Sequence, residues 1–207
     1  MPPVISIEQF KGGVMKTATA VALADAAGEA GADVLLADTD PQGSASRWFQ
    51  LAEATGRPLR CTVAGVASRK LPERLPIMAA PYAMAFVDGP PLDEHLVGAG
   101  MQVADLVVMP IPPNKGDMDR VTASLNLART LGKPVLAVQT FTRPNTVRAI
   151  EAREALEAAG VDVAQTTVPR SDPIGDQYGS RPRGRLAAYG RELLSEILDK
   201  LDKLERA

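Results

Sequence analysis

The sequence predicts an α/β protein in which a mostly parallel, twisted sheet carries helices on both of its faces. Short segments rich in Val, Ile and Leu alternate along the chain with longer segments rich in Ala and Leu that have helical periodicity. Such alternation is typical of right-handed β-α-β units, whose strands pair in parallel. The runs VLLA, LVVM and VLAV are apolar at every position, as expected for strands that are covered on both faces.

The expected strands follow one another at regular intervals. Each is a short run rich in apolar or β-branched residues. The first is the run VISI, and the second and fourth each end in an aspartate. In order, the strands cover residues 4–7, 34–38, 59–63, 83–88, 106–109, 135–139 and 161–168.

The expected helices fill the intervals between the strands. The first follows a glycine-rich segment and ends near Gly31, and the others have apolar residues three or four positions apart. In order, they cover residues 17–30, 44–54, 68–79, 93–103, 119–131, 146–159 and 186–206. Residues 169–184 contain Pro, Gly, Asp and Ser throughout and form the longest expected loop. A loop of this length in a compact domain is usually functional.

Length and composition limit the class of protein. A chain of 207 residues that is 45% hydrophobic suits one globular domain, residues 1–207. A net charge of −2 excludes a protein that coats nucleic acid over its whole surface, and the single cysteine excludes a disulfide framework. No segment approaches the roughly 18 apolar residues of a membrane span, and the first ten residues lack the pattern of a secretory signal. We therefore expect a cytoplasmic protein with no membrane partner.

A glycine-rich loop follows the first expected strand, with the sequence Phe-Lys-Gly-Gly-Val-Met-Lys-Thr at residues 10–17. Ligands of parallel sheets bind beyond the carboxyl ends of the strands, where this loop lies. Consecutive glycines allow backbone N–H groups to turn toward an anion, and the start of the next helix adds its positive dipole end. The loop therefore predicts a phosphate site. The alternative is a glycine-rich turn before a surface helix with two solvated lysines.

Carboxylates follow two further strands at the same edge of the predicted sheet. Asp38 ends the second strand and Asp40 follows it in the run DTDPQG, and Asp88 ends the fourth strand in the run AFVDGPP. Carboxylates near a triphosphate can organise a metal ion and position an attacking water. Alternatively, Asp38 and Asp40 cap the following helix, and Asp88 begins a turn.

These three motifs, in this order, resemble those of the P-loop NTPases of the ParA/MinD superfamily, and the K-G-G-x-x-K-T of this chain resembles their deviant Walker A motif. The resemblance implies ATP or ADP and Mg²⁺ as cofactors. It implies that Lys11 reaches the partner's phosphates in a dimer, that Lys16 binds phosphate in its own subunit, and that Asp40 orients the hydrolytic water. The implied metal site consists of Thr17, Asp38 and Asp88, with Asp38 in the outer shell. The implied nucleotide contacts are Lys11, Gly12, Gly13, Val14, Met15, Lys16, Thr17, Ala18 and Pro169.

Two residues depart from the family's pattern. Met15 stands where family members have glycine, beside the expected β-phosphate, and a side chain there predicts crowding or altered backbone dihedrals. Ala18 replaces a threonine, which removes a hydroxyl that could reach the α-phosphate. Three outcomes stay open: normal ATP binding, weak binding, or a degenerate member that does not hydrolyse ATP.

The resemblance implies a ParA-type ATPase in plasmid or chromosome partition. Such a protein switches between an ATP-bound sandwich dimer and an ADP-bound or free monomer, and it binds DNA non-specifically as a dimer. A ParB-like or other centromere-binding partner protein stimulates its ATP turnover. The implied location is the nucleoid. The alternative is a ParA/MinD-like protein with poor hydrolysis that positions another cargo. Because the first expected strand begins at residue 4, we expect no N-terminal DNA-binding extension.

The C-terminal part supplies two further expectations. Arg181, Arg183 and Arg185 lie near the start of the last helix and form a candidate DNA-binding stripe, although they could equally be solvated or paired with nearby carboxylates. The last helix has one apolar face but carries acidic and basic residues in similar number. We expect it to pack on the sheet, because membrane-surface helices are usually strongly basic.

Overall fold

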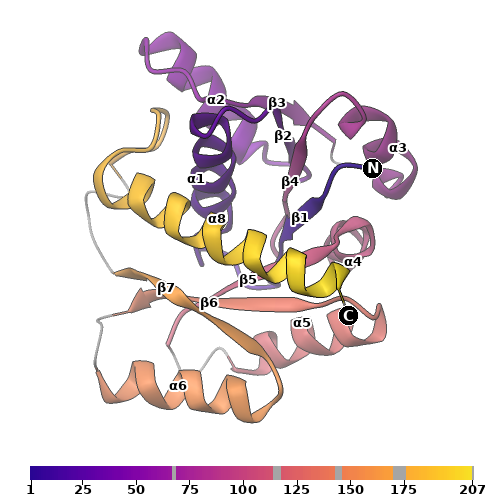
Figure 1. Ribbon diagram of the computed structural model, residues 1–207, viewed down its shortest axis with the longest axis vertical. Helices are drawn as coiled ribbons and strands as arrows, with labels where there is room; N and C mark the ends of the chain where they lie inside the picture. Colours follow the sequence, from indigo (N-terminus) through magenta and orange to yellow (C-terminus); the bar gives the residue numbers. More distant parts are fainter. Residues whose placement is uncertain (67–68, 114–117, 143–145, 170–175, 207) are drawn as a thin grey trace.

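The fold contains one seven-stranded sheet in which every pair of neighbouring strands is parallel, in the order β3-β2-β4-β1-β5-β6-β7. The computed structural model describes residues 1–66, 69–113, 118–142, 146–169 and 176–206 (Figure 1). The predicted α/β class and parallel sheet are therefore confirmed. The strands are β1 (Val4–Ile7), β2 (Val34–Asp38), β3 (Thr62–Gly65), β4 (Met84–Asp88), β5 (Leu106–Ile111), β6 (Val135–Thr142) and β7 (Asp162–Pro169).

Helices cover both faces of the sheet. The described helices are α1 (Lys16–Glu29), α2 (Ser44–Ala54), α3 (Leu71–Ala79), α4 (Glu94–Val103), α5 (Met118–Thr130), α6 (Val147–Ala158) and α8 (Gly184–Glu205). One apolar cluster joins α1, α2 and α8 to the sheet, and two others join α3 to α6 to the opposite face. Strand residues at alternate positions contribute to opposite clusters, as a doubly covered sheet requires.

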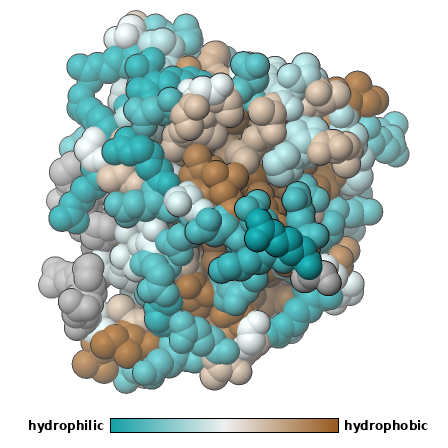
Figure 2. All heavy atoms as spheres, viewed as in Figure 1, coloured by the Kyte–Doolittle hydropathy of each residue, from teal (hydrophilic) through white to brown (hydrophobic). Residues whose placement is uncertain are grey.

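Helix α8 lies across α1 and the sheet (Figure 1). Its inward residues are buried, and its outward side is mostly hydrophilic (Figure 2). The Tyr189 hydroxyl bonds with that of Thr19 on α1, at 3.0 Å. The expectation that this helix packs on the sheet is confirmed. Among the described helices, none combines the length and apolar character that crossing a bilayer requires.

Two expected elements begin later than the sequence indicated. The third strand was expected over residues 59–63, but β3 pairs with β2 only from Thr62 onward. The preceding backbone is engaged elsewhere, because the Arg60 N–H donates to the Asp25 carboxylate at 2.9 Å. The third helix was expected from residue 68 but begins at Leu71, with a proline in its first turn. Proline is favoured in the first turn because the backbone N–H groups there have no acceptor within the helix, and proline has no N–H.

Candidate functional site

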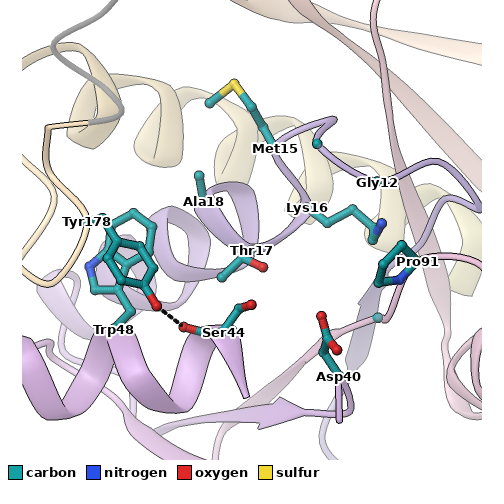
Figure 3. Close-up of a pocket in the computed structure, with 12 residues that line it drawn as sticks. Gly12, Met15, Lys16, Thr17, Ala18, Asp40, Ser44, Trp48, Pro91 and Tyr178 are labelled. Atoms are coloured by element: carbon teal, nitrogen blue, oxygen red, sulfur yellow. Dashed lines mark hydrogen bonds between the residues drawn. The ribbon is translucent and has the colours of Figure 1, made fainter. Parts of the chain in front are cut away.

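A cavity of about 410 Å³ opens beyond the carboxyl ends of β1, β2 and β4. It brings together loop residues 12, 13 and 15–18, Asp40 from the segment after β2, and Gly89 and Pro91 from the segment after β4 (Figure 3). Its size is within the range of small-molecule sites in proteins. The structure adds lining residues that sequence reasoning did not assign to the site: Ser44, Trp48 and Tyr178.

The glycine-rich loop wraps around the side chain of Lys16. The Lys16 ammonium donates to the carbonyl oxygens of Gln9 and Lys11, each at 2.9 Å. Lys16 is 7% exposed and is the first residue of α1, so its charge and the helix N-terminus meet at the cavity. Burial lowers the pKa of Lys16, and the nearby Glu8 and Asp88 carboxyls oppose this shift. A helix N-terminus beside a buried cation is a favourable anion site.

Met15 occupies the left-handed region of backbone conformation, with φ of 74° and ψ of 24°. This explains why glycine suits the position: a non-glycine residue there costs about 1–2 kcal/mol. The side chain extends away from Lys16, Thr17 and Asp40 (Figure 3) and packs against the core beneath α1 and α8. The backbone therefore keeps the conformation that glycine would allow, with the methionine directed to the rim of the cavity.

Asp88 lies fully buried at the end of β4, level with Asp38 on β2. Neither of its carboxylate oxygens has a hydrogen-bond partner among the described residues, although the Thr17 hydroxyl is close enough to lower its pKa somewhat. Burial dominates and raises the pKa of Asp88 to about 8. A buried, unpaired carboxylate is costly, so its presence beside the cavity indicates a function that needs it.

Asp38 and Asp40 have different surroundings. Both oxygens of Asp38 are engaged, because Ser46 donates to one from its backbone (2.8 Å) and its hydroxyl (2.7 Å), and the Asp40 N–H donates to the other at 3.2 Å. Asp38 thus anchors the first turn of α2, as the capping alternative anticipated. Asp40 accepts from the Gln42 N–H at 2.9 Å and lines the cavity with its carboxylate.

The donors at this site fit Mg²⁺ only in combination with a phosphate. Within the described ranges, no group of three or more His, Cys, Asp or Glu side chains could hold an ion. The Thr17 hydroxyl and the unpaired Asp88 carboxylate supply oxygen atoms, which Mg²⁺ prefers. Mg²⁺ is commonly held by one or two such groups together with substrate phosphates.

Glu8 is a buried carboxyl that the sequence analysis missed. It follows β1, is 0% exposed, and accepts from the Ser6 hydroxyl at 2.7 Å, while its Oε2 has no partner in the described part of the chain. Gly89 and Gly100 make room for it, since a Cβ on either would lie about 2 Å from a Glu8 oxygen. Burial raises the pKa of Glu8 well above its ordinary value. The sequence signal that could have identified Glu8 is its position, since it is a charged residue directly after an apolar strand.

The other expected site residues lie around the cavity or away from it. Lys11 is half-buried at the start of the loop, and Val14 belongs to the buried core. Pro169 ends β7, and the following expected loop residues 170–175 lie outside the described part of the chain. Arg183 and Arg185 are exposed at the start of α8, whereas Arg181 donates to the Pro58 carbonyl at 2.8 Å.

A parallel sheet with a glycine-rich loop after its first strand is typical of α/β nucleotide-binding proteins. The family model of the CobQ/CobB/MinD/ParA nucleotide binding domain matches residues 5–181. The chain belongs to this family, and the resemblance drawn from its sequence motifs is confirmed.

Comparison with individual proteins agrees. The chain is 37% identical over 163 residues to maintenance of carboxysome distribution protein A from Gloeobacter kilaueensis, covering 77% of this chain and 73% of that one. A Borrelia burgdorferi plasmid partition protein bound to AMPPNP has a TM-score of 0.75 at 18% identity, with coverage of 97% and 99%. MinD from Pyrococcus horikoshii, complexed with Mg-ADP, has a TM-score of 0.78 at 20% identity, with coverage of 99% and 98%. The two structures support the fold.

Proposed function

We propose that this protein is a ParA-type ATPase that binds Mg-ATP, forms a nucleotide-sandwich dimer, and returns to the monomer after hydrolysis. The supporting observation is the convergence of Lys16, Asp40 and the first turn of α1 on one cavity, with the unpaired Asp88 carboxylate buried beside it. The conformation at Met15 supports nucleotide binding, because the loop backbone follows a path that glycine would also take.

Each residue has a distinct task in this proposal. The loop N–H groups and Lys16 hold the phosphates, and the buried position of Lys16 strengthens its attraction for them. Thr17 and Asp88 hold Mg²⁺, which neutralises phosphate charge when bound, and Asp38 stays in the outer shell while it anchors α2. Asp40 accepts hydrogen bonds from the attacking water and orients it. Lys11 reaches the phosphates of the second subunit, and Pro169 lies beside the nucleoside.

Calorimetric titration with ATP in the presence and absence of Mg²⁺ tests the binding step. We expect saturable binding to the wild-type protein, and strong loss in Lys16→Ala, because the main phosphate-binding cation is gone. Asp40→Ala should keep ATP affinity but lose phosphate release. Wild-type protein that binds no nucleotide would overturn the proposal.

The dimer is proposed to bind DNA non-specifically through the exposed arginines at the start of α8. Arg183 and Arg185 are free of the carbonyl contact that occupies Arg181. A double change of Arg183→Glu with Arg185→Glu should abolish a salt-sensitive shift of random DNA. Arg148→Glu, an exposed arginine on α6, is the control and should bind as wild type does. Unchanged DNA binding in the double variant would refute this surface.

The cargo has two candidates. Plasmid or chromosomal DNA, with a ParB-like partner, follows from the motifs of the small partition ATPases. A protein assembly is the second candidate, favoured by the 37% identity to a carboxysome distribution protein. Deletion of the gene should raise plasmid or chromosome loss in the first case, and should instead cluster a protein body in the second, with DNA inheritance unchanged.

A further inference from the structure

An aromatic wall, formed by Trp48 and Tyr178, closes one end of the cavity (Figure 3). Trp48 belongs to α2, and Tyr178 lies in the segment that precedes α8. The two rings are 5.1 Å apart between centroids and inclined by 58°, which is a favourable tilted arrangement. Trp48 is 3% exposed, whereas 45% of Tyr178 is exposed. Trp48 therefore supports the tyrosine ring from behind and leaves part of it open toward the cavity.

Hydrogen bonds hold this wall in place. The Tyr178 hydroxyl donates to the Ser44 carbonyl at 3.2 Å, and the Trp48 indole N–H donates to the Ser180 carbonyl at 2.8 Å. Between them, Gly179 has a φ of 78°, and a Cβ there would lie 2.6 Å from Leu51. The segment is thus fastened closely to α2, so the tyrosine ring needs little ordering when a ligand arrives.

The phosphate loop gives the cavity a direction. In a phosphate loop the lysine serves the β- and γ-phosphates and the next hydroxyl serves the metal. The residue after these, Ala18, lies farther along α1 toward the aromatic wall, and Asp40 lies at the opposite end (Figure 3). A triphosphate with its terminal phosphate beside Lys16 and Asp40 therefore directs its nucleoside toward Tyr178.

We propose that the base of the bound nucleotide packs against Tyr178, with Trp48 as the support of that ring; this inference rests on the proposed function. Stacking of a base on an aromatic side chain contributes about 1–3 kcal/mol and depends little on the identity of the base. Tyr178 would thereby compensate for the α-phosphate hydroxyl that Ala18 lacks. The wall selects a nucleoside triphosphate over a bare polyphosphate.

The experiment compares Mg-ATP with inorganic tripolyphosphate, which has the phosphates but no nucleoside. Affinities of both ligands are measured for the wild-type protein, Tyr178→Ala and the control Tyr178→Phe. We expect Tyr178→Ala to weaken ATP about tenfold and to leave tripolyphosphate within about twofold. Tyr178→Phe keeps the ring and should bind ATP within about threefold of wild type.

The emission of Trp48, which is the only tryptophan of the chain, gives an independent readout. Because its ring touches Tyr178, ATP should change the emission more than tripolyphosphate does. Equal weakening of both ligands in Tyr178→Ala would overturn the inference, since the tyrosine would then only shape the loop. Unchanged ATP affinity in that variant would also overturn it. If wild-type protein binds neither ligand, the proposed function itself fails.

Discussion

At the scale of single residues, the region beside the cavity contains an unusual concentration of buried ionisable groups. Lys16, Glu8 and Asp88 lie within electrostatic reach of one another, and all three are almost completely removed from solvent. Burial raises the pKa of both carboxyls and lowers that of the lysine, so each group is shifted toward its neutral form. The fold thus retains polar groups here at a cost in stability.

Glu8→Gln tests this cost. Because the folded protein holds a proton on Glu8 that the unfolded chain has lost above about pH 4.5, stability should fall as pH rises toward the raised pKa. One such proton contributes about 1.4 kcal/mol per pH unit. Glutamine has the same shape and cannot lose a proton, so the variant's unfolding midpoint should fall less between pH 5 and 8. Thermal unfolding across this pH range measures the change in midpoint.

Glu53→Gln, which changes an exposed glutamate, is the control and should have the pH dependence of the wild type. Equal pH slopes for Glu8→Gln and wild type would contradict a raised pKa of Glu8.

Met15→Gly tests the other unusual residue of the loop. Glycine relieves the left-handed strain, which is worth about 1–2 kcal/mol, but it gives the unfolded chain more freedom. We expect the free energy of unfolding to change by about 1 kcal/mol at most. Because the side chain is directed away from Lys16 and Asp40, ATP affinity should stay within about threefold. Calorimetric titration of both proteins with ATP measures the two affinities. Binding by the glycine variant alone would show that the methionine side chain blocks the phosphate.

At the scale of the elements, the contact between α1 and α8 determines how the C-terminal helix covers the sheet. Gly190 on α8 faces Ala22 on α1, and a Cβ at Gly190 would lie 2.3 Å from the Ala22 carbonyl oxygen. Only glycine permits this approach, and a larger residue must separate the helices. The position of α8 matters for the site, since the segment that carries Tyr178 leads directly into it.

Gly190→Ala should therefore destabilise the protein by about 1–3 kcal/mol, as overpacking does. Gly98→Ala is the matched control: Gly98 is also inside a helix, but its added Cβ would meet nothing within 4 Å. That variant should be unchanged or more stable by about 0.5–1 kcal/mol, since alanine favours the helix. Urea unfolding with an unchanged slope measures both. Similar losses in the two variants would exclude the close approach as the cause.

At the scale of the whole molecule, the proposed switch depends on a second copy of the chain. Lys11 stands at the start of the loop and does not line the cavity of its own subunit. Lys11→Ala should consequently bind ATP within about threefold of wild type but fail to dimerise, because the cross-subunit phosphate contact is lost. Light scattering of the ATP-bound protein after gel filtration measures the mass. A dimer formed by this variant would show that another contact joins the subunits.

The order of strands and helices, the loop and the three aspartates were predictable because each depends on local sequence. Apolar runs of strand length identify buried parallel strands, and the phosphate loop is a continuous segment. Glu8 was missed because its surroundings come from Gly89 and Gly100, far along the chain. The aromatic wall was missed for the same reason, since Trp48 and Tyr178 are 130 positions apart and meet only in the folded protein.

The sequence alone determined the class of fold and the family, and it located the segment proposed to bind phosphate, because hydrophobic periodicity and short motifs act over neighbouring residues. Only the tertiary structure decided that Asp38 anchors α2, that the buried Asp88 has no hydrogen-bond partner among the described residues, and that the Met15 side chain extends away from Lys16 and Asp40. These properties depend on burial and on contacts between distant segments. The free-energy cost of a charged or strained residue depends on this burial and on these contacts, and neither can be read from the neighbouring residues in the sequence.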